Sequence, residues 1–211
     1  MKLLYLFPVV SYQSKISNND ELKDMMLSDI VKESKSLKVP EGWAAPDSLK
    51  TSWSEGDIHN VLDKHQSELY SSYMECFDEI FDKEYEIKVS NIWFNLYEEG
   101  ASQELHDHIT NPNGLMRPAH FSCIHFLSYD KNVHTPVQFC DPLGGSRFLS
   151  PSLSRDYVSG LIDVDISEGD FLMFPCYLQH RVKPQKVSDI PRVTISFNIR
   201  LSKYGDSVAD D

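Results

Sequence analysis

Two segments in the first 82 residues have hydrophobic residues at helical spacing. In residues 18–37 they recur every three or four positions, behind Asn and Asp residues suited to helix capping. Residues 57–81 show the same spacing along one stripe. Both patterns predict amphipathic helices that support a core from outside. The stripe residues are Leu22, Met25, Met26 and Ile30 in the first segment and Val61, Leu62, Leu69, Tyr73, Phe77 and Ile80 in the second.

The segments around these helices lack helical spacing. Residues 3–10, LLYLFPVV, form a short apolar run that contains Pro8. Lys2 and this run resemble the start of a signal peptide, but no small-residue cleavage site follows, so we expect a buried strand. Residues 39–54 contain two prolines, Gly42 and two tryptophans without any period, which predicts a loop packed on the surface.

After Lys83 the pattern changes to strands divided by turn residues, and it continues to about Leu201. In the segment SNIWFNLY, successive side chains should face opposite sides of a sheet. One side then carries Ile92, Phe94 and Leu96, and the other carries Asn91, Trp93, Asn95 and Tyr97. Further strands are expected at residues 120–127, 133–139, 162–166, 171–174 and 192–201, with turns at Asn113-Gly114, Gly144-Gly145 and Gly169-Asp170.

Strands this numerous, without helices between them, favour a mainly β fold, either a sandwich or a jelly-roll barrel, with the N-terminal helices laid outside it. The 211 residues suit one domain. We expect three parts in it: residues 1–82 with a strand and the buttressing helices, residues 83–202 with the β core, and a flexible tail at 203–211.

Composition excludes several classes of protein. A chain with 41% hydrophobic and 25% charged residues is globular rather than disordered or repetitive. Its net charge of −12 repels phosphate backbones and anionic lipids, so we expect no nucleic-acid partner. No run of about 18 apolar residues is present, so we expect no membrane span. The four cysteines are far apart without a CxxC pair, which favours a reducing, cytoplasmic location.

The first chemical motif is ELHDHIT, in which His106 and His108 flank Asp107. On an extended segment, residues i and i+2 project to the same side, so both imidazoles can share one metal ion while Asp107 projects away. The same sequence also fits a polar loop with exposed histidines, so the histidine pair alone is weak evidence for a metal site.

A third histidine, His180, ends the segment EGDFLMFPCYLQH, where a strand on a rigid barrel should stop. Arg192 begins the strand RVTISFNIRL, and Thr194 lies on its side of that strand. Inside a barrel, an arginine is costly unless an anion meets it, and its planar guanidinium can bind a carboxylate with two parallel hydrogen bonds. Taken singly, the histidine would more often be structural, and the arginine could equally lie on an exposed face.

Together these motifs resemble those of the iron(II)- and 2-oxoglutarate-dependent oxygenases, particularly members found in marine bacteria and their phages. The likeness covers residues 91–200 and, more loosely, LFPVV near the start and residues 50–53. No single motif is diagnostic, but their order and spacing are specific. The matching residues are Asn91, Trp93, Asn95, Gln103, His106, His108, Ser122, Asp141, Pro142, Gly169, Asp170, Phe174, Pro175, His180, Arg192, Thr194, Ser196, Phe197 and Asn198.

The resemblance implies a double-stranded β-helix, a jelly-roll and cupin-like barrel, that uses Fe(II), 2-oxoglutarate and O2 to hydroxylate an unidentified small-molecule or protein substrate. Thr194 stands where the family has serine, which keeps the hydroxyl group. The implied metal ligands are His106, His108 and His180; the implied cosubstrate ligands are Arg192 and Thr194, with Asn95, Tyr97 and Ser122 as further candidates.

His108 departs from the wider superfamily, in which a carboxylate occupies its place in an H-x-D…H motif. Either three histidines bind the metal, or an acidic residue such as Asp107 enters instead. Three neutral imidazoles leave Fe(II) with its full charge, which dianionic 2-oxoglutarate would offset by chelation.

Two other functions fit the same residues. A three-histidine cupin dioxygenase would need no 2-oxoglutarate, and Arg192 would then hold a carboxylate of the substrate itself. A non-catalytic jelly-roll module would hold a structural metal or none. Residues 110–118 follow the histidine motif and would either cover the site or simply connect two strands.

Overall fold

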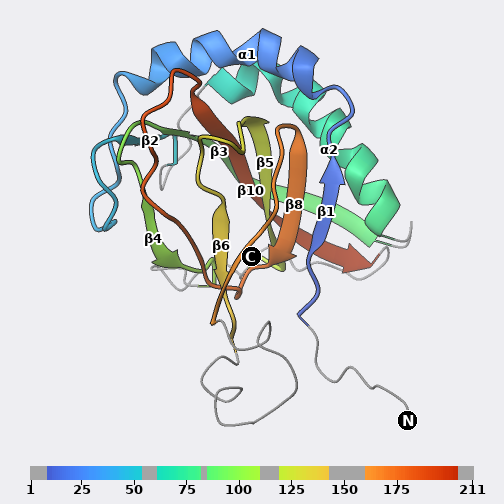
Figure 1. The fold of residues 1–211 in the computed structure, drawn as a ribbon. Coiled ribbons are helices and arrows are strands. Elements are labelled where there is room, and N and C mark those ends of the chain that lie inside the picture. Colours follow the sequence, from blue (N-terminus) through green and yellow to red (C-terminus); the bar gives the residue numbers. More distant parts are fainter. Residues whose placement is uncertain (1–8, 54–60, 82–84, 110–118, 143–159, 204–211) are drawn as a thin grey trace.

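The computed structural model describes residues 9–53, 61–81, 85–109, 119–142 and 160–203. Within these ranges, two antiparallel sheets form a barrel and two α-helices lie on one side of it (Figure 1). The elements are β1 Tyr12–Lys15, α1 Asn19–Ser34, β2 Leu49–Thr51, the 3-10 helix η1 Val61–His65, α2 Gln66–Ile80, β3 Tyr85–Tyr97, β4 Gln103–His106, β5 Phe121–Ser128, β6 Val137–Cys140, β7 Leu161–Asp163, β8 Asp170–Pro175, β9 His180–Val182 and β10 Arg192–Lys203.

Two buried apolar clusters contain residues of both sheets. The larger sheet has the strand order β1-β8-β5-β10-β3-β2, and the smaller has the order β4-β9-β6-β7. Phe126 of β5, Phe139 of β6 and Phe174 of β8 belong to one of these clusters, and Leu49 of β2 and Val182 of β9 belong to the other. This arrangement is the double-stranded β-helix, or jelly-roll, barrel predicted from the sequence.

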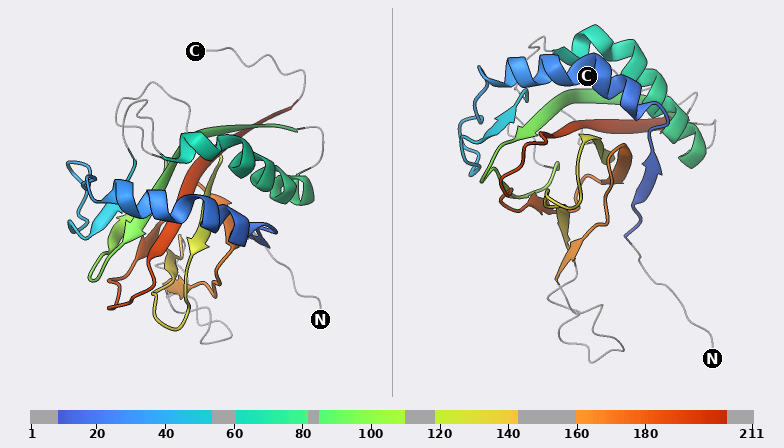
Figure 2. Two further views of the ribbon diagram at one scale, coloured as in Figure 1. Left: turned by 90° about the horizontal axis from the view of Figure 1, so that it is seen from above. Right: turned by 45° about the horizontal axis from the view of Figure 1, so that its top comes forward.

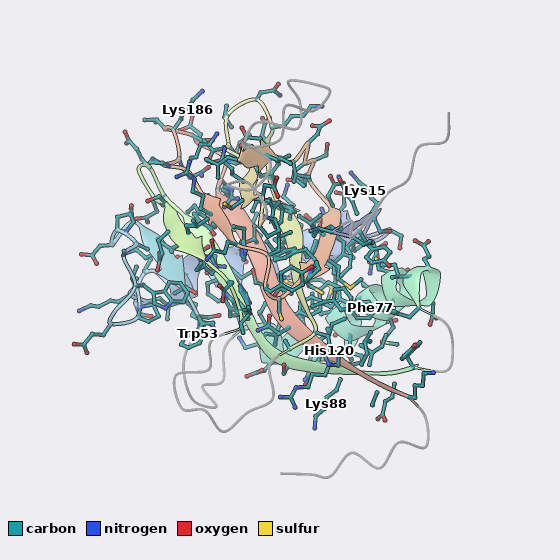
Figure 3. The ribbon with its side chains drawn as sticks, turned by 90° about the horizontal axis from the view of Figure 1, so that it is seen from below. Lys15, Trp53, Phe77, Lys88, His120 and Lys186 are labelled. Carbon is teal, nitrogen blue, oxygen red and sulfur yellow. The ribbon has the colours of Figure 1, made fainter. Side chains whose placement is uncertain are left out.

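The helices cover the outer face of the larger sheet, as predicted, and Figure 2 shows both lying across it. Phe77 of α2, labelled in Figure 3, packs its ring against Phe171 of β8 and Phe197 of β10. Burying one such side chain stabilises the fold by roughly 1.5–3 kcal/mol. Leu22, Met26 and Ile30 of the predicted first stripe are buried in the same cluster, whereas Met25 is 42% exposed because it lies beside the stripe.

Several predicted boundaries were wrong. The first helix ends at Ser34 rather than residue 37, and the strand expected at 133–139 begins only at Val137, because residues 131–134 form a turn. The predicted surface loop at 39–54 contains β2, which pairs with the end of β3. The strand expected at 162–166 is β7, at Leu161–Asp163.

Other predictions lie partly or wholly outside the described residues. Of the strand expected at 3–10, only Val9 and Val10 are described, and neither is in a strand; the nearest one, β1, begins at Tyr12. The described part of the second helix starts with η1 and continues as α2. The turns at 113–114 and 144–145, the loop 110–118 and the tail after Lys203 are not described. Gly169 does form the predicted turn, with φ of 79°.

The alternation predicted for β10 and for residues 92–97 of β3 is confirmed and directs polar side chains into the barrel, whereas the side chain of Asn91 lies outside the described residues. Phe94 and Ile195 pack under the helices, while their neighbours in sequence line an internal cavity. Across the β3–β10 ladder, the inward residues pair as Arg192 with Tyr97, Thr194 with Asn95, and Ser196 with Trp93. No helix among the described residues is long and apolar enough to cross a membrane.

Candidate metal and cosubstrate site

Two histidines of the smaller sheet and a third just beyond its strand β4 converge at the cavity. His106 is the last residue of β4 and pairs with His180, the first residue of β9. His108 lies two residues beyond β4, where its backbone N–H donates to the carbonyl of Cys176 at 2.8 Å. One ligating nitrogen of each histidine lies within 4.8 Å of those of the other two. One metal ion can therefore reach all three imidazoles.

Each imidazole has its Nδ1 atom in a hydrogen bond. His106 Nδ1 lies 2.8 Å from the carbonyl oxygen of Glu104, and His180 Nδ1 lies 3.1 Å from that of Leu178. His108 Nδ1 lies 2.8 Å from Oδ1 of Asn198. All three partners are acceptors, so each Nδ1 carries the hydrogen and each Nε2 offers a lone pair. Histidine ligands are oriented in this way around transition metals.

Burial keeps the three imidazoles neutral. It lowers the pKa of His106, and together with the neighbouring His106 it lowers the pKa of His108 to about 4. The pKa of His180 lies well below its ordinary value because of burial first and the two other histidines second. Neutral imidazoles can bind a metal without first losing a proton, so the donor set fits a divalent first-row ion.

Alternation alone does not explain how these histidines meet. The pairing of β4 with β9 shifts by one residue between Gln103 and His106, as in a β-bulge, and both residues line the cavity. Asp107 instead accepts the N–H of Ile109 at 3.1 Å. His180 begins a new strand after a turn, and does not end β8 as the sequence pattern had suggested.

Arg192 supplies a buried cation to the same cavity. Its residue is 1% exposed, and its Nε and Nη1 atoms have no hydrogen-bond partner within the described part of the chain. Its Cζ atom lies 4.0 Å from the centroid of the Tyr97 ring. Thr194 lines the same cavity. Because an uncompensated buried charge costs several kcal/mol (of order 3–5), this guanidinium fits an anion such as a carboxylate.

Tyr97 and Asn95 line the cavity beside Arg192. Burial raises the pKa of Tyr97, so its hydroxyl stays protonated and donates to Oε1 of Gln103 at 3.0 Å. The Oδ1 atom of Asn95 is buried without a partner in the described chain, and so is Nε1 of Trp93, whose ring stacks on His108 with centroids 5.9 Å apart. Both side chains leave polar atoms for a bound molecule.

Ser122 lies outside the set of cavity-lining residues. Its hydroxyl donates to Oδ1 of Asn198 at 2.9 Å, the oxygen that also bonds His108. Arg181, the residue after His180, bonds Gln138 through Nε at 2.8 Å and does not line the cavity. Sequence reasoning gave no role to Asn198, Trp93 or Gln103, although all three stood in the matched motifs.

Solved structures of similar fold are known. The fold is similar to that of a Pseudomonas putida prolyl-4-hydroxylase, at 13% identity, 91% coverage of this chain, 92% of that chain and a TM-score of 0.58. A Trichoplax adhaerens prolyl hydroxylase, solved in complex with a hypoxia inducible factor peptide fragment, is 14% identical over 90% of this chain and 83% of its own, with a TM-score of 0.56.

HygX from Streptomyces hygroscopicus, solved with nickel and 2-oxoglutarate bound, is 12% identical over 91% of this chain and 83% of that chain, with a TM-score of 0.56. No curated protein sequence matches the chain. The family described as "Putative 2OG-Fe(II) oxygenase" matches residues 91–198, half of the chain and the segment that supplies all three histidines and Arg192. The chain therefore belongs to the 2OG-Fe(II) oxygenase family, whose cofactors are iron and 2-oxoglutarate.

Proposed function

We propose that His106, His108 and His180 bind the Fe(II) of this oxygenase, and that Arg192 and Thr194 bind the far carboxylate of 2-oxoglutarate. The observation that carries this proposal is one cavity lined by three converging neutral imidazoles and by a buried guanidinium whose Nε and Nη1 atoms have no hydrogen-bond partner among the described residues. Bound together, iron and 2-oxoglutarate supply the oxidising chemistry with O2, by which a C–H bond of the substrate is hydroxylated.

The chain's own side chains then have separate tasks. The histidine Nδ1 hydrogens remain on their acceptors, which keeps every Nε2 directed at the ion. Arg192 offers two parallel N–H groups to the carboxylate, and the Thr194 hydroxyl adds a third hydrogen bond. Asn95 and Tyr97, which line the same cavity, are further ligands of 2-oxoglutarate. Apolar lining residues exclude water from the cavity: Ile124, Phe126, Val137 and Val182.

The substrate in this proposal is a protein or small molecule, and the peptide class has the clearer support. Two proteins of similar fold are prolyl hydroxylases, and one of them was solved in complex with a peptide fragment. We also propose a cytoplasmic location, because the four cysteines are free thiols and a reducing compartment preserves both thiols and Fe(II).

The test is anaerobic reconstitution followed by admission of O2. We expect about one Fe(II) per chain and slow conversion of 2-oxoglutarate to succinate without substrate, because that half reaction needs only iron, cosubstrate and O2. Iron binding without binding or consumption of 2-oxoglutarate would instead favour the dioxygenase that takes its substrate directly. Failure to bind any metal would favour the non-catalytic module.

A further inference from the structure

Asn198 of β10 connects His108 to the larger sheet. Its Oδ1 atom lies 2.8 Å from His108 Nδ1 and 2.9 Å from the Ser122 hydroxyl. Ser122 and Asn198 are directly paired across β5 and β10, so their side chains share one face of the sheet. Two donors fill both lone pairs of one amide oxygen, and the amide is thereby fixed in place.

The other two histidines are oriented differently. His106 and His180 each donate Nδ1–H to a backbone carbonyl two residues earlier in the chain, at Glu104 and Leu178. Those acceptors exist whatever the side chain at that position. Only His108, of the three, depends on the side chain of a distant residue, 90 positions away in sequence.

The direction of the Asn198 amide decides which nitrogen of His108 can bind a metal. With Oδ1 toward the ring, Nδ1 carries the hydrogen and Nε2 has a free lone pair. With the amide reversed, its NH2 group would donate to Nδ1, and the ring hydrogen would move to Nε2. That nitrogen could then no longer act as a ligand.

We propose that Asn198, held by Ser122, is the positioning residue that keeps His108 in its ligating tautomer. This inference rests on the metal role proposed for His108. It also gives a reason why histidine works where the superfamily has a carboxylate: an acceptor on β10 holds the imidazole in the form that binds the ion. Because that acceptor is a neutral amide, it adds no negative charge to the site.

The decisive comparison is between Asn198→Leu, which removes the acceptor at similar size, and Asn198→Asp, which keeps an acceptor in the same place. We expect Asn198→Leu to lose about 10- to 100-fold in affinity for Co(II) or Fe(II), the usual effect of losing a group that orients a ligand. Asn198→Asp should recover most of that loss. Ser122→Ala should lose less than Asn198→Leu, because the direct acceptor remains.

The tautomer itself gives a readout that a general loss of stability would not change. Nitrogen-15 spectra of the metal-free protein should show His108 protonated on Nδ1 in the wild type and in Asn198→Asp, and a mixture of tautomers in Asn198→Leu. Ser90→Ala is the matched control, since Ser90 is paired with Asn198 from the opposite side and bonds only its backbone carbonyl, at 3.4 Å.

The proposal is overturned if Asn198→Leu keeps both the wild-type tautomer and metal affinity within about twofold, or if Asn198→Asp loses as much metal affinity as Asn198→Leu. A protein that binds metal but does not convert 2-oxoglutarate would refute the proposed oxygenase mechanism, and would leave these two readouts intact.

Discussion

The guanidinium of Arg192 lies over the ring of Tyr97, with 4.0 Å between Cζ and the ring centroid, and the two residues are paired across β10 and β3. A desolvated cation–π contact is worth about 2 kcal/mol, but the face of a ring gives no acceptor to Nε–H and Nη1–H, which lie in the plane of the guanidinium. Its Nε and Nη1 have no acceptor in the described chain. The contact therefore fixes the side chain and leaves Nε and Nη1 for an anion.

Replacing Arg192 by Leu should weaken 2-oxoglutarate binding by roughly 2–5 kcal/mol, because the carboxylate loses a buried, charge-assisted partner. Iron content should stay near one per chain. Thermal stability without ligand should be unchanged or higher, since an unpaired buried charge is removed. Calorimetric titration with 2-oxoglutarate, iron analysis and thermal unfolding measure the three effects.

Arg181→Leu is the control for this change, because Arg181 does not line the cavity and bonds Gln138. It should keep the wild-type affinity for 2-oxoglutarate. Equal losses in the two variants, or no loss in Arg192→Leu, would mean that the cosubstrate carboxylate is held elsewhere.

The sheet faces around this pair were predictable from sequence, because alternation needs only the local pattern. Ile195 and Phe197 on one side of β10, and Arg192 and Thr194 on the other, were assigned correctly for that reason. The short strands β4 and β9 were not predicted as a pair. Strands of three or four residues contain too few positions for a period to show, and their pairing depends on contacts 70 or more residues apart.

The role of Asn198 could not be predicted for a different reason. The residue lies on the inner side of its strand in any alternation model, but its partner His108 follows β4, beyond the end of a strand with a shifted register. The strand register decides which side chain an asparagine contacts across the barrel. This register cannot be derived from the local pattern of the sequence.

Replacing His108 and replacing Asp107 should have different effects on iron affinity. His108→Ala should lose most of the iron affinity, because a ligand is deleted, whereas Asp107→Ala should retain it, because the Asp107 carboxylate accepts the N–H of Ile109. His108→Asp recreates a two-histidine, one-carboxylate site and should still bind Fe(II). The iron content of the three purified variants tests whether His108 or Asp107 is the ligand.

Circular dichroism of each variant is the necessary check that the fold persists. Loss of metal in Asp107→Ala together with retention in His108→Ala would reverse the assignment. Asp107 would then be the carboxylate ligand of the site.

His125 should make stability depend on acid pH independently of the metal. It is fully buried between Asn19 and Tyr73, at 2.7 and 3.2 Å from its ring nitrogens, and burial lowers its pKa from 6.5 to about 3. Between those pH values the unfolded chain takes up a proton and the folded chain does not. The contribution of His125 to the free energy of unfolding is therefore complete above pH 6.5. It declines as the pH falls toward 3, by up to about 1.4 kcal/mol per pH unit.

The comparison that isolates this effect is metal-free wild type against His125→Gln. Glutamine can still donate toward Asn19 and accept from Tyr73, but it does not titrate. Urea unfolding at several pH values between about 7 and 4 should show a shallower decline in the free energy of unfolding for the variant. Parallel curves for the two proteins would show that His125 is not the group responsible.

Metal and 2-oxoglutarate should bind with positive coupling. The lining residues described for the cavity include Arg192 and no carboxylate, so Fe(II) bound by three neutral histidines would add two positive charges beside a buried third. A dianion that contacts both cations offsets this repulsion. We expect 2-oxoglutarate to raise metal affinity by about 5- to 150-fold, and metal to raise 2-oxoglutarate affinity by the same factor, since coupling is reciprocal.

Anaerobic titrations with Co(II), with and without 2-oxoglutarate, measure both factors. His108→Asp should reduce the coupling, because its carboxylate already neutralises one charge, and a coupling factor as large as that of the wild type would contradict this electrostatic origin.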